Sequence, residues 1–217
     1  MTFHFDKNNT FCISLESKPE RWARMEQRFQ HFAMDVTRWV ASTPSTVTDS
    51  FVHYLNVFQK ACAQSHINLW KHMIQHELPY AFIMEDDAMF DKEWVSRLND
   101  IEPMLKTDTE WHAVFLNVSE PYPTTFQWMI ARDQYLTGAY ILSLNGAKRL
   151  LQMFSHEYAS ADWMTTRLQT HGHSYTYFPW LVIQEGYEST IGSGVEADHA
   201  KVLRCLGEIH YDLHNYI

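Results

Sequence analysis

Three consecutive carboxylates, Glu85-Asp86-Asp87, follow the apolar run Tyr80-Ala-Phe-Ile-Met84. Adjacent acids repel one another and lose solvation, so a simple turn would more cheaply use Asn, Gly or Ser. Because alternate side chains of an extended segment share a face, we expect Glu85 and Asp87 to point together and Asp86 to point away. Two such carboxylates suit a hard cation, Mg²⁺ or Mn²⁺, with positions left for phosphate and water. The alternative is an acidic turn whose charges complement a following helix.

Other side chains could also contact a ligand or a metal, but each has a plainer explanation. His66, next to Ser65, is either a ligand contact or a half-buried imidazole bonded to the backbone. His72 and His76 are four residues apart, as in some zinc sites, but they lack the HExxH pattern and an evident third ligand. Asp162 falls in the first turn of a predicted helix, where it could merely complement the helix dipole. Four residues of the C-terminal tail are either metal ligands or solvated surface groups: Asp198, His199, His210 and His214.

Composition limits the class of protein. The 217 residues are enough for one domain with a sizeable core, and we predict a single domain over residues 1–217. A hydrophobic content of 46%, with 8 Trp, 11 Tyr and 13 Phe, excludes a disordered chain. The net charge of -9 and the absence of a basic cluster in the sequence argue against nucleic acid and against a polybasic membrane contact.

The expected compartment is the cytoplasm. No apolar run in the sequence approaches the roughly 20 residues of a membrane helix, and the N-terminus lacks the signal-peptide pattern. Cys12, Cys62 and Cys205 have no CxxC spacing, which favours a reducing environment without a disulfide framework or a structural zinc site. Peripheral membrane association through a Trp-rich face stays open.

Strands and helices alternate along the chain, which predicts an α/β fold with a mostly parallel, Rossmann-type sheet flanked by helices. The sequence contains no GxGxxG fingerprint. Buried strands are expected at 10–15, 37–41, 80–84, 111–118 and 135–143, an extended segment at 174–178, and helices at 20–32, 58–77, 91–105, 144–154 and 160–172. The carboxylates therefore lie at the end of a core strand.

A specific ordered set of motifs surrounds these carboxylates. The set comprises Ala61-Cys62-Ala-Gln-Ser65-His66-Ile-Asn-Leu69-Trp70-Lys71, then Leu78-Pro79-Tyr80, then Glu85-Asp86-Asp87, with support from Ile13-Ser14-Leu15, Pro19-Glu20-Arg21, Gly138-Ala139-Tyr140-Ile141-Leu142-Ser143, Ala147, Ala161-Asp162, Pro179 and Gln184. In order and separation this set resembles glycosyltransferase family 25, which includes bacterial lipooligosaccharide galactosyltransferases and collagen galactosyltransferases. The resemblance extends over about residues 11 to 191.

The resemblance implies a GT-A fold, a UDP-sugar donor, and Mn²⁺ or Mg²⁺ at the Glu-Asp-Asp motif. The implied reaction is inverting transfer of a hexose, galactose first, to a hydroxyl of a glycan or glycoconjugate, as in lipopolysaccharide or glycan biosynthesis. It implies the following roles: Glu85 and Asp87 hold the metal and the diphosphate, Asp86 contacts the donor sugar or ribose, Leu15, Arg21, Ser65 and His66 line the donor site, and Asp162 is the base with Glu185 in reserve.

The sequence also departs from the family pattern. Ser14 stands where the first strand often has Asn, Lys60 where many members have Gly, and the chain is short between its first two strands. The main alternative is therefore a non-catalytic relative that binds nucleotide-sugar or glycan. A metal-dependent phosphohydrolase is disfavoured, because Leu15-Glu16-Ser17 replaces the Asp-x-Asp-x-Thr motif that its first strand would carry.

Overall fold

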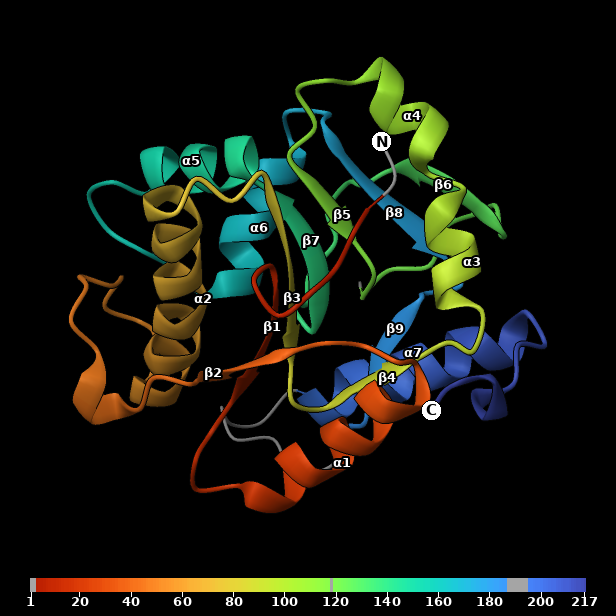
Figure 1. The fold of residues 1–217 in the computed structure, drawn as a ribbon, viewed down its shortest axis with the longest axis horizontal. Coiled ribbons are helices and arrows are strands. Elements are labelled where there is room, and N and C mark those ends of the chain that lie inside the picture. Colours follow the sequence, from red (N-terminus) through yellow and green to blue (C-terminus); the bar gives the residue numbers. More distant parts are fainter. Residues whose placement is uncertain (1–2, 118, 187–194) are drawn as a thin grey trace.

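A seven-stranded sheet forms the centre of the protein, whose computed structural model describes residues 3–117, 119–186 and 195–217, with side chains of the last segment from residue 199 (Figure 1). Its strand order is β2-β1-β3-β7-β5-β8-β6. The bounds are β1 Thr10–Ser14, β2 Thr37–Val40, β3 Tyr80–Glu85, β5 Ala113–Phe115, β6 Gln127–Ile130, β7 Ala139–Ser143 and β8 Ser174–Phe178. A separate antiparallel pair joins β4 (Ala88–Phe90) to β9 (Val182–Gln184).

Strand directions confirm the predicted α/β class with a mostly parallel sheet. Strand β1 is parallel to β2 and to β3, and β5 is parallel to β8. Strand β7 lies antiparallel between β3 and β5, and β6 is antiparallel to β8. Apart from β6 and β7, the strands of this sheet therefore run in one direction, so the carboxyl ends of β1 and β3 meet at one edge of it.

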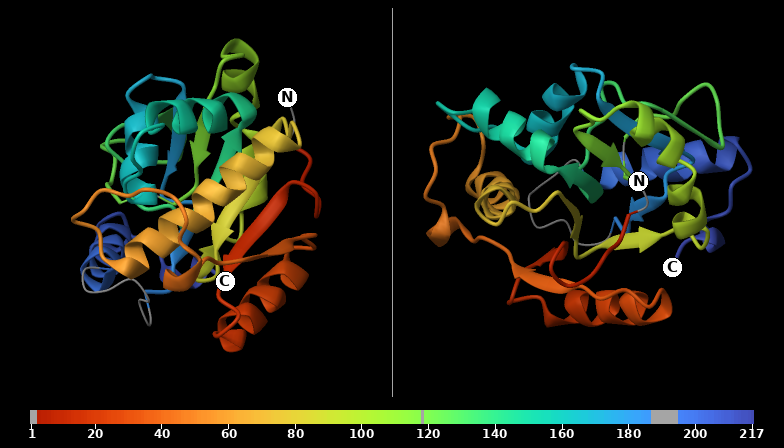
Figure 2. Two further views of the ribbon diagram at one scale, coloured as in Figure 1. Left: turned by 90° about the vertical axis from the view of Figure 1, so that its left-hand side faces the viewer. Right: turned by 45° about the horizontal axis from the view of Figure 1, so that its top comes forward.

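Helices cover both faces of this sheet. Their bounds are α1 Pro19–His31, α2 Val57–Gln75, α3 Trp94–Asn99, α4 Glu102–Thr107, α5 Leu144–Met153, α6 Ala161–Gln169 and α7 Val195–Glu208, with short 3-10 turns at Pro44–Thr46 and Leu213–Asn215. Figure 2 shows α1 on the side of the sheet opposite to α2, α5 and α6. The core is accordingly double: Trp70 and Leu150 belong to one buried cluster, and Met25 and Trp94 to the other. Among the described residues, no helix has the length and apolar character needed to cross a bilayer.

Strand β3 and helix α2 place the chemistry-bearing residues. Strand β3 is buried from Tyr80 to Met84, because core clusters lie on both of its faces. Helix α2 begins at a capping box in which the Asn56 side chain accepts from the backbone N–H of Phe58 and Gln59, at 2.9 and 2.8 Å. This fixed start sets which residues of α2 face the end of β3.

Several predicted elements differ from those in the structure. The single helix expected at 91–105 is wrong: β4 precedes it, and the helical segment breaks into α3 and α4. Pro103 lies in the first turn of α4 and has no backbone N–H, so it cannot make the helical hydrogen bond to the carbonyl four residues earlier, at Asn99, where α3 ends. The strand expected at 111–118 is regular only from Ala113 to Phe115, and residue 118 lies outside the described residues. Strands β4, β6 and β9 were not predicted.

Candidate active site

Two neighbouring cavities open at the carboxyl end of β3. The larger, of about 380 Å³, is lined by all of the predicted donor and metal residues: Leu15, Arg21, Ser65, His66, Glu85, Asp86 and Asp87. The smaller, of about 120 Å³, is lined by the predicted base Asp162 together with Thr137. Cys62, Glu85 and Gln184 line both cavities. The fold therefore brings these distant sequence motifs together and separates the predicted base from the predicted donor residues by one shared wall.

A buried guanidinium joins the last two acids of the motif. Nη2 of Arg21 lies 2.6 Å from Oδ1 of Asp86 and 3.1 Å from Oδ2 of Asp87. The amide of Gln184 also donates to Oδ1 of Asp87, at 3.2 Å. Our expectation that Asp86 points away from Asp87 is wrong, because β3 ends at Glu85 and strand alternation does not extend into the turn that follows.

Burial, and then the crowding of negative charge, raises the pKa values of the last two acids of the motif. Burial, followed by the charges of Glu85 and Asp86, raises the pKa of Asp87 to about 7, although Arg21 acts in the opposite direction. Burial also raises the pKa of Asp86 above its ordinary value. One guanidinium thus neutralises only part of the charge of three carboxylates, and a divalent cation among them would supply the remainder. Nε of Arg21 is buried and makes no hydrogen bond within the described part of the chain.

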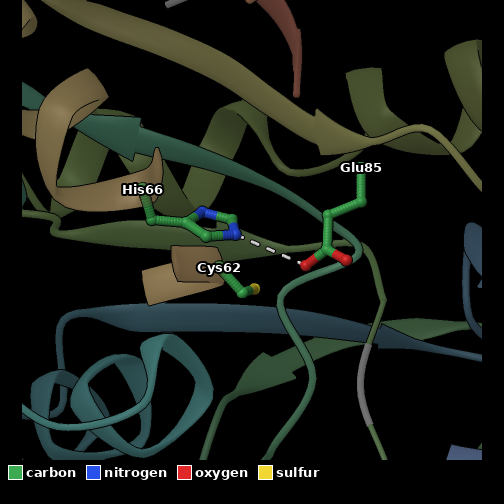
Figure 3. Close-up of side chains that lie close together, drawn as sticks. All are labelled: Cys62, His66 and Glu85. Carbon is green, nitrogen blue, oxygen red and sulfur yellow. Dashed lines mark hydrogen bonds and ion pairs between the residues drawn. The ribbon is translucent and has the colours of Figure 1, made fainter. Parts of the chain in front are cut away.

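Glu85 faces a different set of partners, which Figure 3 shows in part. Its Oε1 accepts from the hydroxyl of Thr137 at 3.1 Å and lies 3.4 Å from Nε2 of His66. Burial alone would raise the pKa of Glu85, but the contacts with His66 and Thr137 outweigh it, and the pKa lies below its ordinary value. Glu85 is therefore ionised at neutral pH, in contrast to the partly protonated Asp87.

His66 is held from behind by a buried hydroxyl. Its Nδ1 lies 2.9 Å from the hydroxyl oxygen of Tyr140, and this oxygen also accepts from Nε1 of Trp70 at 2.9 Å. The side chain of His66 is fully buried, and the partners of its two ring nitrogens are the side chains of Tyr140 and Glu85. The plainer explanation, a half-buried imidazole bonded to the backbone, is therefore wrong. Its Nε2 faces the cavity and Glu85.

The remaining donor-site residues shape the cavity wall. The Ser65 hydroxyl donates to the carbonyl of Ala61 at 3.0 Å and accepts from the backbone N–H of Ser42 at 2.8 Å. It thereby ties the loop after β2 to helix α2. The carbonyl of Leu15 accepts from Nη2 of Arg38 at 3.0 Å, at the end of β1.

The two candidate bases have contrasting environments. Asp162 is half-buried in the first turn of α6, and its Oδ1 accepts from the backbone N–H of Trp163 at 2.7 Å. Glu185 is buried and paired with Arg24, whose Nη2 lies at 3.1 Å, and with Arg28. Glu185 is not among the lining residues of either cavity and is engaged by two guanidinium groups, whereas Asp162 lines the smaller cavity, so the geometry favours Asp162 over Glu185.

The C-terminal candidates differ in position. His199 packs against Gly186, two residues after the cavity residue Gln184. His210 and His214 are exposed. The side chain of Asp198 lies outside the described residues.

Four site residues were absent from the predicted set: Cys62, Thr137, Tyr140 and Gln184. Cys62 precedes His66 by four residues on α2, a spacing that places both on one helix face. The ligand atoms of Cys62, His66 and Glu85 all lie within 4.8 Å of one another. Cys62, Tyr140 and Gln184 stand in the motif set that carries the family resemblance, which was a signal in the sequence. Thr137 lies outside that set and approaches Glu85 only through the tertiary fold.

Comparison with known proteins identifies the family of the chain. The sequence model of glycosyltransferase family 25 (LPS biosynthesis protein) matches residues 7–165. The chain belongs to this family, which confirms the resemblance found in the motifs. It is 24% identical to the procollagen galactosyltransferase 1-A of Xenopus laevis over 170 residues, which are 66% of this chain and 28% of the relative.

Two further similar proteins are a relative named probable inactive and a solved glycosyltransferase structure. The chain is 25% identical over 169 residues to the probable inactive glycosyltransferase 25 family member 3 of Rattus norvegicus, covering 66% of this chain and 30% of the relative. A solved glycosyltransferase involved in the glycosylation of the major capsid of PBCV-1 aligns with a TM-score of 0.42 and 8% identity over 90% of this chain and 98% of its own. The chain spans less than a third of the length of the two curated relatives.

Proposed function

We propose that the protein is a metal-dependent inverting glycosyltransferase that moves a hexose from a UDP-sugar to a hydroxyl of a glycan or glycoconjugate. Galactose is the first sugar to test, because a family relative is named a procollagen galactosyltransferase. The observation that carries the proposal is the pair of cavities with a common wall at Glu85. A donor in the larger cavity and an acceptor in the smaller one would meet at that wall.

The larger cavity supplies the chemistry of a donor site. Its carboxylates are hard oxygen ligands, and Glu85 and Asp87 are the two that would hold Mn²⁺ or Mg²⁺. A cation there fits the structure because Asp87 is raised to a pKa of about 7 by burial and by its acidic neighbours, a condition that a nearby positive charge relieves. When bound, the metal supplies charge neutralisation for the departing diphosphate.

The protein's own groups orient the reactants. Arg21 fixes Asp86 and Asp87 in one arrangement, and Thr137 with His66 fixes Glu85. This preorganisation holds the acids in place before the donor arrives. In the smaller cavity Asp162 is the group available to take the proton of the acceptor hydroxyl as that oxygen attacks the anomeric carbon.

A binding protein without transfer activity is the second candidate, because one family relative is named probable inactive. The enzyme requires a donor in the larger cavity and Asp162 in the smaller one, whereas the binding protein requires only a nucleotide-sugar or a glycan and does not depend on Asp162. The two are therefore separated by measuring donor binding and transfer on the same preparations.

Thermal unfolding tests donor binding directly. The protein is heated with UDP, UDP-galactose, UDP-glucose or GDP-mannose, each with and without Mn²⁺. A ligand at a hundred times its dissociation constant adds about 2.7 kcal/mol to the free energy of unfolding, which moves the midpoint by several degrees. We expect metal-dependent stabilisation by one UDP-sugar and release of UDP when an acceptor is present. No shift with any nucleotide contradicts the proposal, and a shift without transfer to any screened acceptor selects the binding protein.

A further inference from the structure

Cys62, His66 and Glu85 form a compact group of three different metal-ligand types (Figure 3). All three line the larger cavity, and Cys62 and Glu85 also line the smaller one. The Cys and the His come from successive turns of α2, and the Glu ends β3. Their ligand atoms lie within 4.8 Å of one another. Cys62 and Glu85 are partly accessible, so an ion can enter from the cavity, whereas His66 is fully buried behind them.

The separation between His66 and Glu85 is unusual for a hydrogen bond. Nε2 of His66 lies 3.4 Å from Oε1 of Glu85, whereas N–H···O bonds are typically about 2.9 Å and charge-assisted ones are shorter still. Zinc ligands about 2.0–2.2 Å from a tetrahedral ion place a nitrogen and an oxygen about 3.4 Å apart. The two atoms therefore already have the spacing of two ligands on one zinc ion.

The neighbours of these residues also suit a metal. A metal-binding imidazole usually donates its second N–H to a fixed oxygen, which sets its orientation. The hydroxyl oxygen of Tyr140, 2.9 Å from Nδ1 of His66, is such a partner. Two ligand atoms of one tetrahedral zinc ion lie roughly 3.4–3.7 Å apart. Because the three ligand atoms all lie within 4.8 Å of one another, small side-chain rotations would bring them to that spacing.

The chemistry of this group differs from that of the oxygen site. A thiolate and an imidazole select Zn²⁺ over Mg²⁺ or Mn²⁺, which prefer carboxylates and water. Glu85 is common to the two sets of ligands. Zn²⁺ on Cys62 and His66 would therefore withdraw Glu85 from the site of the donor metal.

We propose that Cys62, His66 and Glu85 bind Zn²⁺, with the fourth position open to the cavity, and that this ion blocks the donor site. Binding forms a zinc–sulfur bond and releases the thiol proton of Cys62 to solvent. The ion takes the Nε2 lone pair of His66, so the proton that Nε2 directs at Glu85 is exchanged through solvent to Nδ1, where it faces the Tyr140 hydroxyl oxygen. The zinc site stands on its own geometry. Its effect on the donor rests on the proposed function.

The first measurement is zinc binding to the full chain without any affinity tag. Equilibrium dialysis against Zn²⁺ is expected to give one ion per chain at this site, and Co²⁺ in its place is expected to give a thiolate-to-metal absorption band. Cys62→Ser should abolish the band and weaken zinc binding at least tenfold. The matched control Cys205→Ser, which changes a buried thiol of α7, should change neither. Equal affinity in wild type and Cys62→Ser would overturn the site.

The imidazole pair at the C-terminal end of α2, His72 in its last turn and His76 as its C-cap, needs its own control. The rings of His72 and His76 have centroids 4.3 Å apart and could bind zinc without the thiol. His76→Gln is expected to leave the thiolate band and the affinity of the cavity site unchanged. Loss of all zinc binding in His76→Gln assigns the ion to that surface pair and overturns the proposal. Circular dichroism of each variant establishes that it is folded before binding is measured.

The second measurement is the Mn²⁺-dependent stabilisation by the UDP-sugar, repeated with added Zn²⁺. We expect Zn²⁺ to reduce this stabilisation in wild type and a chelator to restore it. In Cys62→Ser, the UDP-sugar stabilisation should be the same with and without Zn²⁺. Zinc that binds through Cys62 without changing donor binding overturns the blocking effect. Absence of any UDP-sugar stabilisation contradicts the proposed function, and the zinc site is then judged by dialysis and the Co²⁺ band alone.

Discussion

At the scale of single residues, we expect substitutions of the two candidate bases, Asp162 and Glu185, to have different effects on transfer rate and stability. Asp162 lies on the smaller cavity with one backbone hydrogen bond, whereas Glu185 is buried between Arg24 and Arg28. We expect Asp162→Asn to lower the transfer rate by about 10²–10⁴-fold, the usual contribution of a general base, and to leave UDP-sugar stabilisation unchanged. Initial rates of UDP release and thermal midpoints measure the two effects. Full activity in Asp162→Asn would remove Asp162 as the base.

Glu185→Gln tests whether the carboxylate of Glu185 contributes to stability through its ion pairs with Arg24 and Arg28. The substitution leaves Arg24 and Arg28 without their charge partner, and Arg28 is largely buried. Breaking a buried ion pair from one side costs about 3–5 kcal/mol, and partial exposure of Arg24 reduces this value. We expect a lower free energy of unfolding in urea and a transfer rate per folded molecule that falls less than in Asp162→Asn. A selective loss of rate without loss of stability would contradict this structural role.

Arg21 is the residue on which the acidic turn depends. It contacts both Asp86 and Asp87, and its side chain is almost fully buried. Arg21→Met removes the only guanidinium in the larger cavity among the described residues and leaves two carboxylates unpaired, so we expect a loss of about 3–5 kcal/mol in the free energy of unfolding. Mn²⁺ should restore more stability to Arg21→Met than to wild type. Equal effects of Mn²⁺ on the two proteins in urea would argue against a metal among these acids.

At the scale of elements, α2 positions Cys62, Ser65 and His66, and the start of α2 depends on its cap. The Asn56 side chain accepts from two backbone N–H groups of the first turn. Asn56→Ala should lower the free energy of unfolding by about 1 kcal/mol, whereas Asn56→Asp should lower it much less, since both Asn and Asp are good caps. Urea unfolding measures this difference. Indistinguishable stabilities would mean that packing alone fixes the start of α2.

Elements with strong local signals could be predicted, and those that depend on pairing could not. Strand β3 shows five consecutive buried apolar residues, and the acids after it mark the edge where the cavities open. Strands β4 and β9 have three residues each and exist because they pair with one another across distant sequence. The prediction of the orientation of Asp86 was wrong for a related reason. The Asp86 side chain is oriented by its ion pair with Arg21, a residue of α1, and not by the alternation of side chains along β3.

At the scale of the whole molecule, pH is predicted to change stability through a histidine far from the cavities. His112 is 7% exposed, its Nδ1 has no hydrogen bond within the described residues, and its ring contacts those of His171 and His173. Burial, and then the neighbouring His173, His171 and Arg149, lower the pKa of His112 to about 4, against the weaker opposing effect of Asp108. The folded protein therefore keeps this imidazole neutral where the unfolded chain would protonate it.

The sign of the effect follows from which state binds the proton. Between about pH 6.5, the ordinary pKa of His, and pH 4, the unfolded chain holds more protons at this position, so stability falls as the pH decreases through that window. The contribution of His112 is about 2–3 kcal/mol by the lower end of the window. His112→Asn lacks this titration and should lose less stability than wild type between pH 7 and pH 4.5, when each is compared with its own value at pH 7. Urea unfolding at these two pH values tests this. Parallel losses in the two proteins would assign the acid sensitivity to other groups, such as Asp108, whose pKa is raised by burial but lowered overall by its contacts with Tyr175 and His173.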